Sequence, residues 1–504
     1  MPTRPDVDGP AEVGEMDEQV DVVVVGGGNA GFSAAHAAVA RGRSVLLLEK
    51  GQAGEAGGNS FYTAGAFRIT HDGIPSVADL LDEDDRLPVS ELPPYPAEAY
   101  LADMAKVTSG NNDPELTAAL VGDSQDALRW LHGLGLRFRL MYERQAYLDE
   151  ATGRYTFWGG LAVGSTDGGK GLIAQHTAAA ESAGVQIRYG VRAGELVVED
   201  GRVRGVTWQD ATGAAGTVYA DSVVLAAGGF EADAEMRAEH LGAGWARAKV
   251  RGTPLNTGDM LRSALAIGAV PHGDWSTCHS VAWDARFPEN ESNRELTNQL
   301  TRGGYPLGIV VNTDGERFLD EGADYRNYTY AKYGAAILEQ PGGQAFQVFD
   351  AATRPRLRAE EYDMPGASVV VAETVAELAA GMGVDPAALG RTIDDFNAGI
   401  DRSVPFDPAV KDGRASRVDP PKSNWAVPLE TAPFYAFPVT CGITFTFGGL
   451  RADTGARVLD RSGNPIPGLF VCGEMLGGLF SGNYPGGTGL TSGAVFGRRA
   501  GSQA

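Results

Sequence analysis

The chain has 504 residues, too many for a single hydrophobic core, and its 43% hydrophobic and 21% charged residues are typical of globular domains. Its net charge of −23 would repel nucleic acid and anionic lipid, and the absence of a membrane-spanning apolar run excludes stable membrane insertion. Three cysteines without CxxC spacing and an acidic start without a signal pattern argue against disulfides, metal sites and export, and favour the cytoplasm.

The first clear structural signal is a strand, a helix and a strand near the start of the chain. Residues 1–19 show no apolar periodicity and are predicted to form a flexible N-terminal extension. The apolar run at residues 20–25 is typical of a buried parallel strand, and the alanine-rich segment after Gly31 predicts a helix that stops at Gly42. Residues 44–49 predict a second strand, which completes a βαβ unit.

Further elements are expected before residue 230. Asp113 and Pro114 are residue types of a helix N-cap and first turn, and they predict a helix that extends to residue 131. Glycines at positions 168, 169 and 171 open a second predicted helix over residues 172–183. Strands are then predicted at residues 185–189, 195–199, 202–208 and 222–226.

The character of the chain changes between about residues 271 and 440. Asn, Pro, Tyr and charged residues replace the buried runs there, and glycine-rich loops return near the end of the chain. We therefore expect an α/β protein with a Rossmann-like nucleotide-binding domain built from residues 20–270 and 441–504. Residues 271–440 would form an inserted domain.

Gly26, Gly28 and Gly31 form a GxGxxG pattern between the first strand and the first helix. The first glycine permits a tight turn, the second lets backbone N–H groups approach a pyrophosphate, and the third allows close packing of helix on strand. The helix N-terminus then attracts the phosphate charge. Glu49 ends the second strand, where it can accept hydrogen bonds from ribose hydroxyls. These residues predict a dinucleotide site but do not separate NAD from FAD.

Two further glycine-rich segments distinguish an FAD site from an NAD site. One follows Lys50 and contains Gly57-Gly58-Asn59-Ser60 and Ala64-Gly65-Ala66. The other lies near the C-terminus, where IPGLFVCGE (residues 466–474) is followed by NYPGGTGLTSGAVFGRRAG, a glycine loop that opens a helix. An NAD site needs none of these, whereas a buried isoalloxazine needs backbone against its flat ring and a helix N-terminus near its N1/O2 edge. The sequence therefore predicts FAD.

With these motifs, the chain resembles the fumarate reductase/succinate dehydrogenase flavoprotein superfamily in its soluble, single-chain branch. The resemblance rests on VVVVGGGNAGFSAA, LLLEK, GGNSFYTAGA, VVLAAGGF, NTGDM, VVNTDGERFLDE and the C-terminal glycine loop, and covers nearly the whole chain. Within the branch, DEGADYRNYTYAKYG (residues 320–334), TFTFGGL and NYPGGTGL are most similar to FAD-dependent tricarballylate dehydrogenases. This resemblance implies that residues 271–440 form an α+β capping domain over the isoalloxazine.

The resemblance also implies which residues hold the cofactor. Besides Gly26 and Gly31 of the fingerprint, the implied FAD contacts are Gly28, Asn29, Ala30, Glu49, Lys50, Gly58, Asn59, Ser60, Gly65, Ala66, Val191, Ala226, Asp259, Glu474, Gly489 and Leu490. Asp259 and Glu474 would hold ribityl or pyrophosphate-side groups. No histidine follows the GGNS loop within three residues, so we expect the FAD to be bound non-covalently.

At the reacting centre, the family holds a dicarboxylate with two histidines and an arginine, and a further arginine faces flavin N5 as the acid. His279 matches the first histidine, and Arg326 lies one residue later than the spacing of the catalytic arginine. Arg302 matches a relay arginine, although Gln299 stands in place of the expected glutamate. Two positions depart from the pattern: Phe445 stands at the second histidine and Tyr484 at the substrate arginine.

These departures change the expected substrate. Losing a histidine and an arginine removes two charge-assisted hydrogen bonds, each typically worth about 1.5–3 kcal/mol, so a tight fumarate site is not expected. The Tyr484 phenol could donate a hydrogen bond to a carbonyl or carboxylate, or act as a base. Ketosteroid dehydrogenases of the wider superfamily use tyrosines at a similar place.

Each candidate residue also has a structural interpretation. Arg326 could form an ordinary ion pair with Asp320, Glu321 or Asp324, and His279 could be a hydrogen-bonded core residue. Arg302 could be structural and Tyr484 could only cover the flavin. Four tyrosines of the DEGADYRN region are expected to be packing residues: Tyr325, Tyr328, Tyr330 and Tyr333.

The sequence thus predicts an FAD-dependent dehydrogenase that forms a C=C bond next to a carboxylate or carbonyl group, with tricarballylate as the leading substrate. Arg326 would exchange the α-proton, with Tyr484 as the competing base, while His279 and Arg302 orient the oxygenated group. The alternatives are a ketosteroid-type or other cyclic-ketone desaturase, a fumarate-reductase-like alkene reductase, a flavin-binding protein without turnover and an NAD(P)H-dependent enzyme. No haem CxxCH or cysteine cluster is present, so electrons would leave to a separate acceptor.

Overall fold

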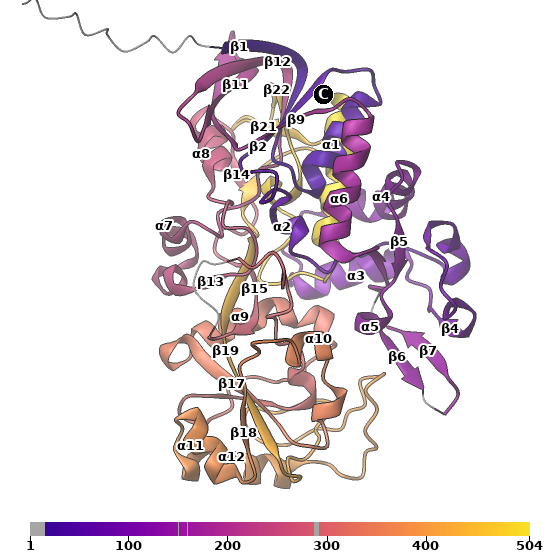
Figure 1. The fold of residues 1–504 in the computed structure, drawn as a ribbon, viewed down its shortest axis with the longest axis vertical. Coiled ribbons are helices and arrows are strands. Elements are labelled where there is room, and N and C mark those ends of the chain that lie inside the picture. Colours follow the sequence, from indigo (N-terminus) through magenta and orange to yellow (C-terminus); the bar gives the residue numbers. More distant parts are fainter. Residues whose placement is uncertain (1–15, 150, 159, 287–291) are drawn as a thin grey trace, which may run out of the picture.

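The computed structural model describes residues 16–149, 151–158, 160–286 and 292–504, and two large β-sheets lie one above the other in Figure 1. The upper sheet has the strand order β10 (Val191–Glu199), β11 (Arg202–Asp210), β12 (Ala215–Leu225), β1 (Met16–Val25), β2 (Val45–Glu49) and β9 (Gln186–Tyr189). β22 (Pro465–Val471) pairs in parallel with β12 and carries β21 (Arg457–Leu459) at its side. A C-terminal strand therefore joins the N-terminal sheet, and the predicted Rossmann-like α/β fold is confirmed.

Strand β1 is the centre of this sheet because both of its edges are paired and its side chains are buried. Residues 22–25 pair in parallel with 45–48 of β2 and with 222–225 of β12. Val22, Val23 and Val24 are completely buried, as expected for a strand covered on both faces. Helices α1 (Asn29–Val39), α6 (Gly168–Ser182) and α13 (Thr488–Gln503) lie beside it (Figure 1).

The boundaries of several elements differ from the prediction. Residues 16–19 belong to β1, so the flexible extension predicted through residue 19 is wrong for them, because they pair with 216–219 of β12. Residues 1–15 of that predicted extension lie outside the described residues. The predicted helix after Asp113 is confirmed as α4 (Pro114–Gly133), and Asp113 Oδ1 accepts hydrogen bonds from the N–H groups of its first turn. Helix α6 and strand β10 each begin four residues before their predicted starts.

The lower sheet is built around one long strand. Its order is β13 (Lys249–Val250), β19 (Phe434–Thr446), β17 (Gln344–Phe349) and β16 (Ile309–Asn312), and β15 (Cys278–Asp284) and β18 (Val370–Ala372) also pair with β19. Helices α9 (Tyr330–Leu338), α10 (Ala359–Tyr362), α11 (Val375–Met382) and α12 (Pro386–Gly399) belong to the same region. We propose that this region forms the capping domain and that it extends beyond residue 440, because β19 continues across that position to Thr446.

Shorter elements complete the described part of the chain. The helices are α2 (Gly58–Phe61), α3 (Ala97–Val107), α5 (Tyr142–Gln145), α7 (Ala234–Met236) and α8 (Asp259–Ala266). There are also three small sheets in the described residues. The first has the order β3 (Ala66–Phe67), β8 (Val163–Ser165) and β5 (Phe138–Leu140), and the second has the order β4 (Ser90–Glu91), β7 (Arg154–Phe157) and β6 (Ala146–Asp149). The third pairs β14 (Pro271–His272) with β20 (Gly449–Leu450).

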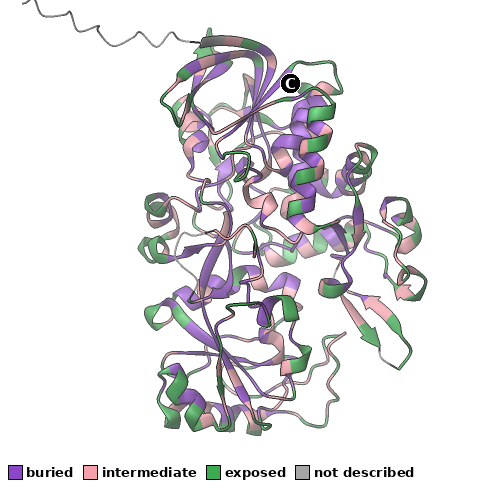
Figure 2. Ribbon diagram, viewed as in Figure 1, coloured by how far each residue is buried: buried purple, intermediate pink, exposed green. Residues whose placement is uncertain are grey.

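Burial separates the strands of the core from the outer helices. In Figure 2, buried residues follow the strands of both sheets, whereas exposed residues mark the outer faces of helices such as α6, α11 and α12. In the part of the chain that the structure describes, no helix combines the length and the apolar character needed to cross a membrane.

Helix α13 lies directly on α1 because glycines recur at its contact face. A Cβ on Gly497 would stand 2.5 Å from the carbonyl oxygen of Ala30, and one on Gly501 would stand 2.0 Å from that of Ala34. We expect Gly501→Ala to lower the free energy of unfolding by about 1–3 kcal/mol, because the two helix backbones must move apart. Urea unfolding followed by circular dichroism measures this change.

The matched control for this prediction is Gly122→Ala in α4. A Cβ on Gly122 would have no neighbouring atom within 4 Å, so alanine meets open space there and improves the helix propensity. Equal midpoints for Gly501→Ala and the wild type would contradict the close packing of α1 and α13.

Candidate active site

A cavity of about 270 Å³ lies where the parallel strands of the upper sheet end. It is lined by residues at the ends of β1, β2 and β12, and by residues of β15 and β19 from the lower sheet. Ligands commonly bind at this edge of open α/β sheets. Gly26, Gly28, Asn29, Glu49 and Ser60 form what we term the nucleotide end of this cavity.

The glycines of the nucleotide end have two distinct roles. Gly26 has a φ of +107°, and a Cβ there would lie 2.3 Å from the carbonyl oxygen of Ala226, so the turn requires glycine. Gly28 and Gly489 are different, because a Cβ on them would meet no protein atom closer than 3.5 Å and 4.0 Å respectively. At these two positions the protein itself does not exclude a side chain. The space that these two glycines leave open in the cavity is suited to a bound cofactor.

Two helices present their N-termini to this cavity. Helix α1 has Gly28 as its N-cap and α13 has Gly487. Because both N-caps are glycines, no N-cap side chain occupies the N–H groups of the first turn. Free N–H groups and the helix dipole at such ends favour a pyrophosphate or the electron-rich edge of an anionic flavin. The residues of the nucleotide end therefore fit FAD.

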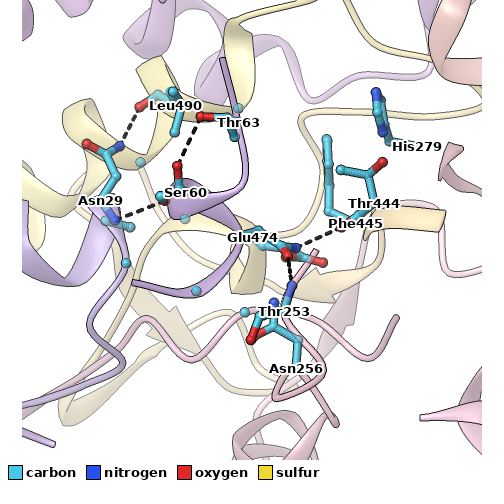
Figure 3. Close-up of a pocket in the computed structure, with 18 of the residues that line it drawn as sticks. Asn29, Ser60, Thr63, Thr253, Asn256, His279, Thr444, Phe445, Glu474 and Leu490 are labelled. Carbon is cyan, nitrogen blue, oxygen red and sulfur yellow. Dashed lines mark hydrogen bonds between the residues drawn. The ribbon is translucent and has the colours of Figure 1, made fainter. Parts of the chain in front are cut away.

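Asn29 ties three separate segments together at the nucleotide end. Its backbone N–H donates to Ser60 Oγ over 3.1 Å, and its Nδ2 donates to the carbonyl oxygen of Leu490 over 2.8 Å (Figure 3). Glu49 accepts hydrogen bonds of 2.7 Å from the N–H groups of Gly27 and Gly51, and burial raises the pKa of its carboxyl group. These contacts fix α1, α2 and α13 around one space.

Acidic groups lie at two further places along the lining. Asp259 binds Lys50 Nζ over 3.0 Å and Arg192 Nη2 over 2.7 Å. Glu474 accepts a hydrogen bond of 2.8 Å from the N–H of Thr446, and burial and the neighbouring Glu231 carboxylate raise its pKa well above the ordinary value. The predicted cofactor residues all line the cavity except Gly31 and Gly65. Those two pack instead against the backbone of Gly26 and of Gly168.

The opposite end of the cavity is formed by His279, Tyr330, Phe445 and Tyr484, which we term the tyrosine end. The hydroxyl oxygens of Tyr330 and Tyr484 are 2.5 Å apart. The rings of His279 and Phe445 are stacked with their centres 5.3 Å apart. Figure 3 shows these two side chains near each other, away from Asn29 and Leu490. Burial, and then the Arg251 charge, lower the pKa of His279 well below its ordinary value, which favours the neutral imidazole.

The predicted arginine Arg326 also lines the cavity. Its Nη2 donates to Glu361 Oε1 over 2.9 Å, and its guanidinium lies 5.9 Å from the centre of the Tyr330 ring. Burial alone would lower the pKa of Arg326, but Glu361 and nearby tyrosines raise it overall. The alternative of an ion pair with Asp320, Glu321 or Asp324 is wrong, because Glu361 takes that place.

Arg302 does not line the cavity, and this is a correction to its predicted catalytic place. Its Nη2 pairs with Asp284 over 2.8 Å, and both side chains are almost completely buried. Its Nη1 also donates to the carbonyl oxygen of Gln299 over 3.0 Å. Because the guanidinium is held by these groups within the lower sheet region, we propose a structural role for it.

Sequence reasoning missed Tyr330 of the tyrosine end and Arg251, which also lines the cavity. Arg251 follows β13 and lines the cavity, but it belongs to no motif that marks it. Tyr330 was predicted to be a packing residue, yet its hydroxyl group meets that of Tyr484. The run of tyrosines in DEGADYRNYTYAKYG was the available signal for it.

Comparison with known proteins agrees with this site. A family model described as an FAD binding domain matches residues 21–490. A probable fumarate reductase of Shewanella frigidimarina (strain NCIMB 400) is 31% identical, covering 97% of this chain and 75% of the relative. A 4-oxocyclohexanecarboxylate 2-dehydrogenase of Sinomonas cyclohexanicum is 29% identical, covering 98% and 94%.

The solved open conformation of a flavocytochrome c3 fumarate reductase superposes with a TM-score of 0.72 at 28% identity, covering 96% of this chain and 78% of that one. The similarity therefore extends over both sheets and the cavity between their ends. The chain belongs to the FAD binding domain family within the fumarate reductase/succinate dehydrogenase flavoprotein superfamily, and it is an FAD-dependent oxidoreductase whose homologues act on C=C or CH–CH groups.

Proposed function

We propose that this chain is a dehydrogenase that forms a C=C bond next to the carbonyl group of a cyclic ketone, with FAD bound non-covalently. The observation that carries the proposal is the Tyr330–Tyr484 hydroxyl pair at the tyrosine end. The rings of Phe445 and Phe480 stand 5.1 Å and 5.4 Å from that of Tyr484, which suits an apolar ring bearing an oxygen. The relative whose name joins a ring ketone with dehydrogenation supports this assignment.

The two phenols would have separate roles. Burial and Tyr330 raise the pKa of Tyr484 well above its ordinary value, so Tyr484 remains a phenol that donates a hydrogen bond to the carbonyl oxygen. This hydrogen bond acidifies the α-carbon, and Tyr330, acting as its phenolate, accepts the α-proton at Oη and becomes a neutral phenol. The Arg326 guanidinium beside the Tyr330 ring stabilises the negative charge of the Tyr330 phenolate. FAD, when bound, would supply the hydride acceptor for the β-carbon, and a separate acceptor would take the electrons.

A second candidate substrate is a tricarballylate-like polycarboxylate. The observation that favours it is a set of five arginines that line the cavity: Arg144, Arg192, Arg251, Arg326 and Arg358. In this case the new C=C bond forms next to a carboxylate instead of a ketone. Phe445 and Tyr484, which stand where the resemblance expects a histidine and an arginine, weigh against a fumarate-like alkene as the substrate.

An anaerobic reduction experiment tests the proposed function. The purified holoenzyme is mixed in separate samples with cyclohexanone, 4-oxocyclohexane-1-carboxylate, tricarballylate and succinate, and the flavin absorbance is followed in time. Rapid bleaching by one of the ring ketones is the expected result. Bleaching by tricarballylate alone selects the second candidate, and reoxidation of chemically reduced enzyme by fumarate alone selects an alkene reductase.

A further inference from the structure

We propose that Arg251 binds a carboxylate group of the substrate, so that the enzyme acts on a keto acid and discriminates against the neutral ketone. This inference rests on the proposed function, because it adds a second anchoring group to the ketone held by the tyrosines. It concerns a residue that belongs to none of the motifs of the chain.

The first argument is the set of partners that hold the guanidinium. Arg251 Nε donates to Thr301 Oγ1 over 3.0 Å, and its Nη1 donates to Thr444 Oγ1 over 2.9 Å. Both acceptors are neutral hydroxyl groups. Within residues 16–149, 151–158, 160–286 and 292–504, no carboxylate forms a salt bridge with Arg251. A guanidinium has five N–H donors, so donors remain for a ligand in the cavity that this side chain lines.

The second argument is the cost of enclosing an unpaired charge. Surrounding protein groups bury the guanidinium away from bulk water, and this burial lowers the pKa of Arg251. The residue as a whole is partly exposed, and it is one of the residues that line the cavity. Arginine nevertheless keeps its proton in proteins, and Glu361 acts on Arg251 electrostatically without forming a salt bridge with it in the described part of the chain. An enclosed charge without a paired counter-ion is costly. A ligand anion would meet that need.

The third argument is position. Arg251 interacts electrostatically with Tyr330 and Tyr484, and its charge also acts on His279. Thr444, which holds its Nη1, lies beside Phe445 at the tyrosine end in Figure 3. A carboxylate on Arg251 and a carbonyl oxygen on Tyr484 can therefore belong to one small molecule.

The fourth argument is the local charge balance. The chain as a whole carries a net charge of −23, yet five arginines line this cavity. Arg192 pairs with Asp259, and the other four are Arg144, Arg251, Arg326 and Arg358. Glu361 neutralises part of this charge, since it pairs with Arg326 over 2.9 Å and with Arg358 over 3.3 Å. Arg144 pairs with Glu360 over 2.7 Å. Arg251 is left as the member of this group with neutral partners, so an anionic substrate has a specific place to bind.

Binding of two aromatic analogues tests the proposal without turnover. 4-Hydroxybenzoate carries a carboxylate opposite its oxygen, whereas 4-methylphenol has a methyl group there, and neither can be dehydrogenated at a CH–CH pair. Calorimetric titration of the FAD-loaded wild type should show tighter binding of 4-hydroxybenzoate. Arg251→Gln should weaken its binding about 10- to 100-fold, the range expected for a charge-assisted hydrogen bond, and leave 4-methylphenol unchanged.

Two further variants complete the experiment. Arg251→Lys keeps the charge without the planar fork and should give an intermediate loss, and it serves as the test variant if Arg251→Gln does not hold FAD. Arg204→Gln removes an exposed arginine of β11 that pairs with Asp221 and does not line the cavity, and should leave both analogues unchanged. Equal affinities for the two analogues in the wild type, or an equal effect of Arg251 replacement on both, would overturn the carboxylate site.

The outcome is separable from that of the proposed function. If no ketone bleaches the flavin but 4-hydroxybenzoate binding depends on Arg251, the result supports the carboxylate site and contradicts the proposed ketone dehydrogenation. If ring ketones bleach the flavin while Arg251 replacement changes neither analogue, the dehydrogenase stands and the carboxylate site falls.

Discussion

Replacing Gly489 with leucine is expected to give a folded protein that no longer holds FAD. Gly489 lies in the first turn of α13, and a Cβ there would point into the cavity with Phe445 Cζ as its nearest neighbour at 4.0 Å. A leucine therefore meets little resistance from the protein but fills space that the cofactor needs. We expect FAD affinity to fall roughly 100-fold or more, since overpacking a fitted site costs up to about 3 kcal/mol.

The measurement is the flavin absorbance of the purified variant in the blue, together with its far-ultraviolet circular dichroism. Gly390→Leu in α12 is the matched control, because it also places a leucine on a helical glycine with no atom within 4 Å. That control should remain yellow. A yellow Gly489→Leu protein with wild-type affinity would show that the cavity is not the flavin site.

The nucleotide end could be predicted because its geometry is local. Gly26, Gly28 and Gly31 are set by one strand, one turn and one helix. The positive φ of Gly26 belongs to that turn, and the need for glycine at Gly31 arises from the Gly26 carbonyl oxygen, whereas the contact of Gly26 with Ala226 joins segments far apart in the chain. Gly489 of α13 also belongs to a motif, the C-terminal glycine loop, which the resemblance to the flavoprotein superfamily locates. Sequence periodicity and turn chemistry are sufficient for such contacts.

The tyrosine end could be predicted only in part, because its contacts join residues far apart in the chain. Tyr330 and Tyr484 are separated by 154 positions, and Arg326 finds Glu361 in a short helix that no motif marks. Arg302 fitted the family spacing, yet Asp284 of β15 holds its guanidinium away from the cavity. Side-chain partners across a sheet depend on register and packing, which a single sequence does not specify.

Replacing Tyr484 with phenylalanine is expected to slow reduction of the flavin by substrate about 10²- to 10³-fold while FAD remains bound. The ring and its packing against Phe445 and Phe480 remain, so the variant loses only the hydroxyl group that meets Tyr330. Loss of one preorganised donor to a developing oxyanion typically has an effect of this size. Stopped-flow measurement of anaerobic flavin bleaching gives the rate constant, and the effect should fall on this constant more than on substrate affinity.

Three companion variants decide between the phenol pair and Arg326. Tyr330→Phe removes the proposed proton acceptor and should be slower still, by about 10²- to 10⁴-fold. Tyr219→Phe on β12, away from the cavity, should react like the wild type. Because Glu361 keeps Arg326 protonated, Arg326→Gln should slow the reaction by removing a stabilising cation, and less than Tyr330→Phe does. A rapid Tyr330→Phe enzyme beside an inactive Arg326→Gln enzyme would instead assign the proton transfer to the arginine.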